Sequence, residues 1–470
     1  MRLSCTITLI AAAWLAQACS CSSSSLKGEP HLEGFGDCEP GAPVDTSHWI
    51  LQAGGPDDEM ALSAAEMVDG TIVVAGLTGS FSGDIDLWIL RLDGEGSVLG
   101  QWTALEVTED LAPVVAALDD CGMVVAGVTE VDTSGGTDIW LARFDASGTV
   151  LWERNLGGPG DEHSPEVIQT ADGDLLVTAV TESFSSSADM WLVKLDLEGG
   201  ILWQEALGGD GDEQTAGRET LLEAPDGSIY ILAQSSSFSS MEWDAWVIAL
   251  DPDGAVRWQQ AVGVSGTGST TGSAIAMSGG DLYFAGQTDQ SPHPTCAAWL
   301  VRMTTAGDVV WQRAYSAGGC DAATGVAPRA GGGVLVAGFT APESPSSEYD
   351  MWFASIDPDG TIAAQTKIGG TGELELGMSL FIHRDAPLLL GRHISGGGTG
   401  DHDLLLARLQ PDGTLPGTCG LVTDVASTGE DSTAEVLETD VTPLETDGET
   451  RSVALTFGIA DQPVELLCPE

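Results

Sequence analysis

Short runs of apolar residues alternate with polar turns along most of the chain. In one representative stretch the runs cover residues 165–170, 174–181, 189–196 and 201–207, and Gly, Asp, Pro or Ser bounds each of them. Short apolar runs between such turn residues are typical of β-strands. Turns such as Asp172-Gly173 and Asp412-Gly413 place a glycine where a tight hairpin needs a positive φ. The pattern therefore predicts four antiparallel strands in this stretch.

The four-strand pattern recurs in seven copies along the chain. Each copy is marked by a tryptophan followed by an apolar residue, with leucine in place of tryptophan in the seventh, and the spacings are 52, 51, 55, 53, 53 and 53 residues. An aspartate stands two positions earlier in six copies, and Ala297 replaces it in the fifth. We expect these residues to be structural: Trp88, Trp140, Trp191, Trp246, Trp299, Trp352 and Leu405, with Asp86, Asp138, Asp189, Asp244, Asp350 and Asp403. Self-similarity at this period predicts a repeat architecture.

Four antiparallel strands per repeat make one blade of a β-propeller, so the sequence predicts an all-β, seven-bladed propeller over residues 46–415. The seventh copy lacks a fourth strand, because Leu415 is followed at once by Pro416-Gly417. Residues 49–59 match residues 152–162, which contain a fourth strand. We therefore expect the strand at Trp49 to pair with residues 404–409 and to complete the last blade, which leaves no free sheet edge at the closure.

A tryptophan motif links the chain to known propellers. Leu-Asp-x-x-Gly-x-x-x-Trp occurs at residues 195–203 and 250–258. It is similar to the tryptophan-docking motif of quinoprotein-like propellers, a group that includes dehydrogenases and an outer-membrane assembly lipoprotein. Over residues 49–415 the chain also resembles the bacterial seven-bladed β-propeller repeat (SBBP-type) lipoproteins, many of them exported and without an assigned function. The resemblance implies tryptophans that pack between blades, and it leaves the ligand open.

The N-terminus has the features of an export signal. Arg2 precedes the apolar stretch 9–16, and small residues lead to Cys19. Residues 15–19 resemble a bacterial lipobox, with Ala16 where that motif prefers leucine; the resemblance implies a lipid on Cys19. We expect a signal peptide at 1–18, a Ser-rich lipidated tether at 19–45, and an anchor in the cell envelope, at the outer membrane. Because Ala16-Gln17-Ala18 also fits ordinary signal peptidase, a free secreted protein is the alternative.

Acidic residues dominate the charge of the chain. It has 71 Asp+Glu against 16 Lys+Arg, a formal net charge of −55. This charge repels phosphate backbones and anionic headgroups, so we expect no nucleic-acid partner. The acidic corners Asp58-Glu59, Asp161-Glu162 and Asp212-Glu213 lack the spacing of a calcium loop, and we interpret them as solvated turn caps. We expect a monomer without a cofactor, with weak calcium binding as the alternative.

Basic residues and histidines are further candidate site residues. A basic residue stands three positions after the repeat position in five copies, at Arg91, Arg143, Lys194, Arg302 and Arg408. This repetition predicts a structural ion pair with a neighbouring aspartate. His393 and His402 flank one loop of the last copy, whereas His383 falls at the other end of the sheet, so we expect no three-histidine metal site.

Seven cysteines remain after Cys5 of the signal and the lipidated Cys19, an odd number for an oxidising compartment. Cys296 and Cys320 depart from the repeat at one end of the same sheet. Hairpin pairing places Cys296 opposite residue 316, and the glycine-rich corner 317–319 allows Cys320 to fold back, so we predict a disulfide; two separate buried thiols are the alternative.

The sequence determines the pairing of the other cysteines less well. Cys419 and Cys468 bracket the acidic segment 416–470, and we expect them to staple a small β appendage, with a free tail as the alternative. The pairing of Cys21, Cys38 and Cys121 stays open.

No catalytic motif is present. The chain has no G-x-S-x-G or H-E-x-x-H sequence, and none of its three lysines, Lys27, Lys194 and Lys367, stands in a P-loop. The sequence therefore predicts a non-enzymatic binding or scaffold protein of the envelope, with an unknown envelope protein or glycan as partner. The alternative is a propeller enzyme or a quinone-cofactor protein with its site at the axial funnel. Because the basic residues are dispersed over the repeats, we expect no converging polar groups at that funnel.

Overall fold

The computed structural model describes residues 48–410, apart from short gaps, and seven strands between residues 422 and 468. The predicted signal peptide, the tether and Cys19 lie outside the described residues. Within the described part of the chain, no helix is long and apolar enough to cross a membrane.

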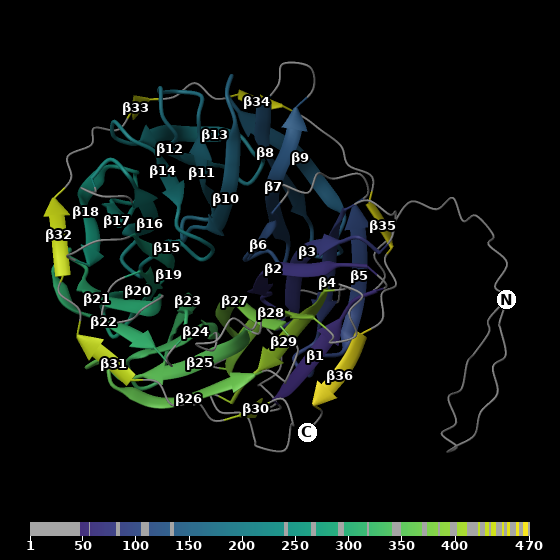
Figure 1. Cartoon of the computed structure of the whole chain (residues 1–470). Helices are drawn as coiled ribbons and strands as arrows, with labels where there is room; N and C mark the ends of the chain where they lie inside the picture. Colours follow the sequence, from purple (N-terminus) through teal and green to yellow (C-terminus); the bar gives the residue numbers. More distant parts are fainter. Residues whose placement is uncertain are drawn as a thin grey trace, which may run out of the picture.

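The fold is an all-β ring of seven antiparallel sheets, as the sequence predicted (Figure 1). From the axis outward, the first three blades contain β2 (Glu59–Glu66), β3 (Ile72–Thr78), β4 (Asp86–Leu92) and β5 (Val98–Ala104); β6 (Val114–Ala117), β7 (Met123–Val131), β8 (Gly136–Phe144) and β9 (Val150–Gly157); and β10 (Glu162–Gln169), β11 (Leu175–Thr181), β12 (Asp189–Leu195) and β13 (Ile201–Leu207).

The remaining four blades have the same order of strands. They contain β14 (Glu213–Thr215) with β15 (Leu221–Glu223), β16 (Ile229–Ser235), β17 (Asp244–Leu250) and β18 (Val256–Val264); β19 (Thr270–Ser278), β20 (Asp281–Thr288), β21 (Ala297–Thr304) and β22 (Val309–Ser316); β23 (Asp321–Pro328), β24 (Val334–Thr340), β25 (Asp350–Ile356) and β26 (Ile362–Ile368); and β27 (Leu374–His383), β28 (Ala386–Ile394), β29 (His402–Arg408) and β1 (Trp49–Ala53).

The N-terminal strand closes the ring. Strand β1 pairs antiparallel with β29, so that Trp49 lies opposite Arg408 and Ala53 opposite Leu404. This is the register that the match between residues 49–59 and 152–162 predicted. The seventh blade is thus built from both ends of the repeat region, and the ring cannot open without breaking this pair of strands.

The C-terminal segment adds a fifth strand to every blade. The added strands, here named the belt, are β30 (Val422–Thr423), β31 (Thr428–Asp431), β32 (Ala434–Glu438), β33 (Leu444–Glu445), β34 (Glu449–Arg451), β35 (Phe457–Ile459) and β36 (Val464–Cys468). They pair in turn with β26, β22, β18, β13, β9, β5 and β1, running backwards around the ring (yellow in Figure 1). We expected a small appendage, but these strands are spread over the whole circumference. Cys419 and the side chain of Cys468 lie outside the described residues, so their disulfide stays a prediction.

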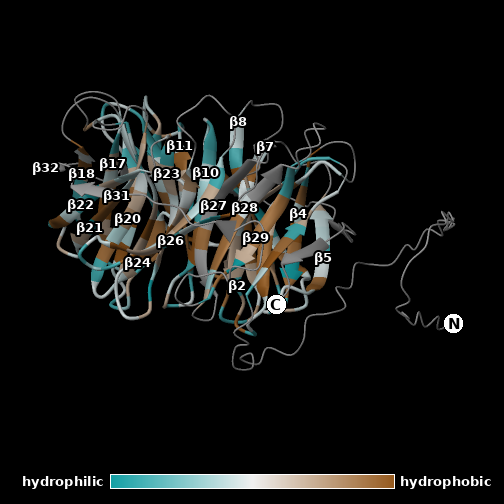
Figure 2. Ribbon diagram, turned by 60° about the horizontal axis from the view of Figure 1, so that its bottom comes forward, coloured by the Kyte–Doolittle hydropathy of each residue, from teal (hydrophilic) through white to brown (hydrophobic). Residues whose placement is uncertain are grey.

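Adjacent blades pack through apolar faces and docked tryptophans. The six repeat tryptophans and Leu405 are buried in the clusters between blades, and hydrophobic residues concentrate in the strands (Figure 2). The indole of Trp152 donates to the carbonyl of Leu197 in the next blade at 2.8 Å, and Trp311 donates to Pro358 at 2.9 Å. These contacts agree with the tryptophan-docking resemblance, because each outer-strand indole is fixed on the turn of its neighbour.

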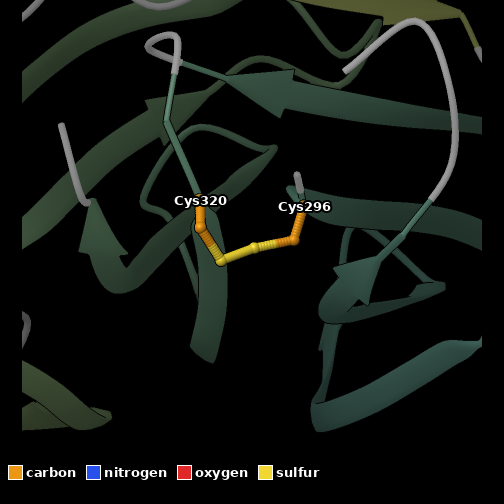
Figure 3. The surroundings of a disulfide bond; sticks show 2 residues. All are labelled: Cys296 and Cys320. Atoms are coloured by element: carbon orange, nitrogen blue, oxygen red, sulfur yellow. A yellow bond between two sulfur atoms is a disulfide. The ribbon is translucent and has the colours of Figure 1, made fainter. Parts of the chain in front are cut away.

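A disulfide joins Cys296 and Cys320, as predicted, with Cα atoms 4.6 Å apart (Figure 3). The pairing is confirmed, but its place differs from the prediction, which put both cysteines in one sheet. Cys296 precedes β21 of the fifth blade and Cys320 precedes β23 of the sixth, because the chain after an outer strand enters the next blade; the bond therefore crosses between blades. At the same two repeat positions the third blade contacts the second through a hydrogen bond, from the backbone nitrogen of Thr137 to Asp161 Oδ1 at 2.9 Å. The disulfide therefore replaces an inter-blade hydrogen bond by a covalent link.

Cys121 is also disulfide-bonded, and its pairing stays open.

Candidate functional site

The candidate site is a cavity lined by residues of the innermost strands. Figure 1 shows these strands around the propeller axis. The volume of the cavity is about 320 Å³, within the range of small-ligand pockets. Residues of β2, β6, β10, the β14–β15 connection and β19 line it, so five of the seven blades contribute. The described wall is mostly aliphatic and carries three buried or half-buried charged groups: Glu166 of the third blade, and Arg218 and Glu219 of the fourth.

Arg218 lies on an insertion that interrupts the inner strand of the fourth blade. Strands β14 and β15 both pair with β16, but the register shifts by four residues between Thr215, opposite Ala233, and Leu221, opposite Ile231. In other blades whose inner strand has a register shift, the shift is a single residue, as in β10. The extra residues form the loop 216–220, which projects towards the axis.

The loop 216–220 is held rigidly by its neighbours. The backbone nitrogen of Glu219 donates to Glu166 Oε1 of the third blade at 2.7 Å, and its carbonyl accepts from Ile275 of the fifth at 2.9 Å. Glu219 has a φ of 60°, and Ser164, which lies in the bulge before Glu166, has 55°. Non-glycine residues in this region are strained by about 1 kcal/mol or more, and such strain gathers at functional sites. The surrounding hydrogen bonds hold both residues in place.

Arg218 reaches across the axial cavity to a third blade. One terminal nitrogen, Nη1, donates to the carbonyl of Pro113, just before β6, at 3.0 Å. Burial lowers the pKa of Arg218, and the negative charges of Glu166 and Glu219 oppose this shift. The guanidinium is therefore a fixed, partly desolvated cation inside a strongly acidic protein.

Glu166 is the second charged group of the cavity, with 8% of its surface exposed. Burial raises the pKa of Glu166 to about 7, although the charge of Arg218 and the Glu219 backbone amide both lower it. Near neutral pH the carboxyl is thus divided between its protonated and ionised forms. A carboxyl in this state can accept a hydrogen bond or donate one, which makes it a candidate functional group.

Stability should therefore depend on pH through Glu166. The pKa of such a carboxyl is higher in the folded chain than in the unfolded chain. Its contribution to stability is complete at a pH below the pKa of the unfolded chain, and it is lost as the pH rises through the pKa of the folded chain. For Glu166 that window runs from 4.5 to about 7. We expect the free energy of unfolding to fall by roughly 2–3 kcal/mol across it. The raised pKa values of the buried Glu59 and Glu213 act in the same direction.

Urea unfolding of wild type and Glu166→Gln, between about pH 5 and pH 8, measures this contribution. The variant should lose part of the slope, whereas Glu95→Gln, at an exposed turn position, should keep it. Equal slopes for wild type and Glu166→Gln would contradict the assignment.

The acidic corners agree only in part with their interpretation as solvated turn caps. The glutamate of each corner is buried and accepts hydrogen bonds from the turn before it and from hydroxyls of the neighbouring strand. Glu162, for example, accepts from the backbone nitrogen of Gly158 at 2.8 Å and from Ser183 at 2.5 Å. Because these carboxyls fasten strands together, the glutamates belong to the blade architecture, whereas Asp58, Asp161 and Asp212 are exposed, as expected of solvated turn caps.

The repeat aspartates lie against these same corners. Asp138, Asp189 and Asp403 each face a turn glycine so closely that a Cβ at Gly157, Gly208 or Gly54 would collide with the carboxylate. Asp403 also accepts a hydrogen bond from Gln52, and Asp350 forms an ion pair with Lys367. Asp86 and Asp244 begin β4 and β17 at the same position of their blades. None of the repeat aspartates or tryptophans lines the described wall of the axial cavity.

Four of the repeated basic residues form ion pairs of the expected kind. The pairs are Arg91–Asp69 at 2.5 Å, Arg143–Asp120 at 2.6 Å, Lys194–Asp172 at 3.0 Å and Arg302–Asp281 at 2.6 Å. Several also reach the next blade: Arg408 donates to the carbonyl of Gly94 at 2.6 Å. These side chains tie blades together and take no part in the axial cavity.

Backbone pairing places the three histidines of the last blade at different points of its sheet. His402 Nδ1 lies 3.0 Å from Asp58 Oδ1, and His393 pairs with Asp403 on the neighbouring strand. His383 ends β27 at the other end of the sheet. Among the described residues, no group of three metal-ligating side chains is found.

Sequence comparisons find no match, and structural comparisons find distant likenesses. No known protein family and no curated protein matches the chain. Among solved structures, an ulvan lyase of a polysaccharide lyase family is 10% identical, with a TM-score of 0.48 over 75% of this chain and 95% of its own. A periplasmic gluconolactonase of Pseudomonas aeruginosa is 14% identical (TM-score 0.33; 68% and 95% covered), and a mutant apocarotenoid oxygenase of Synechocystis 12% (0.41; 88% and 94%).

Two expectations are corrected here. We predicted that the protein is not an enzyme, but the solved structures that match include a lyase, a lactonase and an oxygenase, so neither the fold nor a missing motif supports that exclusion. At such low identity these matches concern the fold alone and transfer no activity. We also expected no converging polar groups at the axis, whereas Arg218 and Glu166 meet there. The sequence contains one sign of the insertion that carries Arg218: the spacing between Trp191 and Trp246 is 55 residues, the longest of the six.

Proposed function

We propose that this protein is an exported, lipid-anchored β-propeller that binds a small polar ligand in its axial cavity. The observation that carries the proposal is the pair of Arg218 and Glu166 in one cavity, on rigid backbone from two different blades. A protein with a net charge of −55 and only sixteen basic residues places one of them at its axis. Burying charged groups is costly, so such a pair indicates a role in binding.

A thermal-shift comparison tests the binding site. A panel of small acids, amino acids, sugars and inorganic phosphate is added to wild type, Arg218→Leu and Arg257→Leu. Arg257 lies on the outer part of the same blade, where it binds Ser228 and Asp251, so it controls for the loss of a cation. A ligand at 100 times its dissociation constant stabilises the fold by about 2.7 kcal/mol. We expect the ligand that shifts wild type and Arg257→Leu to leave Arg218→Leu unshifted; equal shifts in all three proteins would overturn the proposal.

The proposed anchor has its own test. Cys19→Ala removes the thiol that would carry the lipid, and we expect the protein to move from the membrane fraction to the soluble fraction of cells expressing the full-length chain. A single acyl chain gives only marginal membrane binding and a second makes it stable, so the change in partitioning should be nearly complete. Substitution of Cys5, which lies within the expected signal, is the control and should leave partitioning unchanged. Membrane partitioning that survives Cys19→Ala would contradict the anchor.

A further inference from the structure

The guanidinium of Arg218 presents a free edge to the axial cavity. Nη1 is occupied by the carbonyl of Pro113, but within the described part of the chain Nε and Nη2 have no hydrogen-bond partner, and neither atom is buried. Nε and Nη2 form one flat side of the guanidinium, with two parallel N–H groups. This fork matches the two oxygens of a carboxylate, which it binds through two hydrogen bonds.

Glu166 offers a single free oxygen to the same cavity. Oε1 accepts from the backbone of Glu219, whereas Oε2 has no partner among the described residues and is not buried. Oε2 can therefore accept a hydrogen bond from a ligand group that lies beside the one bound by Arg218. The site thus provides a two-pronged donor and a neighbouring acceptor.

The walls and the charge limit the ligand further. Leu62, Val115, Leu221 and Ile275 give the cavity aliphatic walls, and no aromatic side chain occurs in its described lining, so a flat ring or a sugar face would have nothing to stack on. Glu166 and Glu219 stand near Arg218, and the whole chain is strongly acidic. A dianion or polyanion would be repelled, whereas a single carboxylate is compensated by the arginine.

We propose, on the basis of the proposed function, that the axial cavity binds a small aliphatic carboxylate with a hydrogen-bond donor on the neighbouring carbon, as in an α-amino acid or an α-hydroxy acid. The carboxylate lies against the Nε–Nη2 edge of Arg218, the donor lies against Glu166 Oε2, and the aliphatic part fills the space between Leu62, Val115 and Ile275.

Isothermal titration of the full chain with five probes tests this class. The probes are L-leucine, 2-hydroxy-4-methylvalerate, 4-methylvalerate, 3-methylbutylamine and inorganic phosphate. We expect leucine or its hydroxy analogue to bind at least about tenfold more tightly than the acid without a donor and the amine without a carboxylate, since each lost charged hydrogen bond costs more than about 1.4 kcal/mol. Arg218→Leu should abolish binding, and Arg257→Leu should retain it.

The number of protons exchanged on binding distinguishes an amino acid, whose donor is an ammonium group, from a hydroxy acid, whose donor is a hydroxyl. An ammonium group favours ionised Glu166, so leucine binding near pH 7 should release protons; a hydroxy acid adds only negative charge, so its binding should take protons up. Titration in two buffers of different ionisation enthalpy measures this, and Glu166→Gln should remove either effect.

Two results would overturn the inference, and they differ from one another. Arg218-dependent binding of phosphate or of the unsubstituted acid in preference to the substituted acids would refute the ligand class and leave the cavity as the binding site. Binding of any probe that Arg218→Leu leaves unchanged would refute the axial site itself, and with it the proposed function.

Discussion

Removal of residues 416–470 should leave a chain that aggregates instead of forming a stable monomeric ring. The belt pairs with the outermost strand of all seven blades, so its loss exposes seven strand edges at once. Unpaired edges are templates for pairing with other chains. Each lost hydrogen bond costs roughly 1 kcal/mol, and the total is large compared with a typical folding free energy of about 5–15 kcal/mol. The closing strand β1 also loses its outer neighbour β36.

Size-exclusion chromatography and urea unfolding of the truncated chain measure this effect. A local variant, Glu435→Pro with Val436→Pro, tests the mechanism on the fourth blade alone, where β32 pairs with β18. Neighbouring backbone N–H groups point in opposite directions, so one of the two prolines must remove a hydrogen bond to β18. We expect this variant to stay monomeric and to lose about 1–3 kcal/mol. A truncated chain with the size and urea midpoint of the full chain would refute a structural role for the belt.

Loss of the Cys296–Cys320 disulfide should cost about 3 kcal/mol of unfolding free energy, measured by urea unfolding of Cys296→Ala/Cys320→Ala under oxidising conditions. The bond closes a loop with a sequence separation of 24, and the chain-entropy effect of such a loop is of this size. It also spans two blades at a point where Ala297 has replaced the repeat aspartate.

A matched variant introduces the residues that stand at the same two repeat positions in another pair of blades. Cys296→Thr with Cys320→Asp copies Thr137 and Asp161, whose backbone-to-carboxylate hydrogen bond joins the second and third blades. We expect it to recover roughly 1 kcal/mol relative to the double alanine variant, because one charged hydrogen bond is restored without the covalent constraint. If the double alanine variant unfolds at the wild-type urea concentration, the disulfide does not stabilise the ring.

The sequence by itself determined the ring. The spacing of the repeat tryptophans, the turn glycines and the apolar runs are local signals, and they fixed seven blades of four strands. The closure by β1 was also readable, because residues 49–59 copy a fourth strand that the last repeat lacks. The Cys296–Cys320 pairing was also readable, because both cysteines depart from the repeat, although they lie in adjacent blades and not in one sheet.

Only the tertiary structure revealed the belt, the buried corners and the axial pair. The belt strands span two to five residues each in an acidic segment, so they carry no amphipathic pattern; existing strand edges decide where they pair. An Asp-Glu corner looks solvated in sequence, and burial of Glu162 depends on hydroxyls contributed by the neighbouring strand. Arg218 lies on an insertion, and Glu166 comes from another blade. Their meeting depends on how inner strands converge on the axis, which no local pattern encodes.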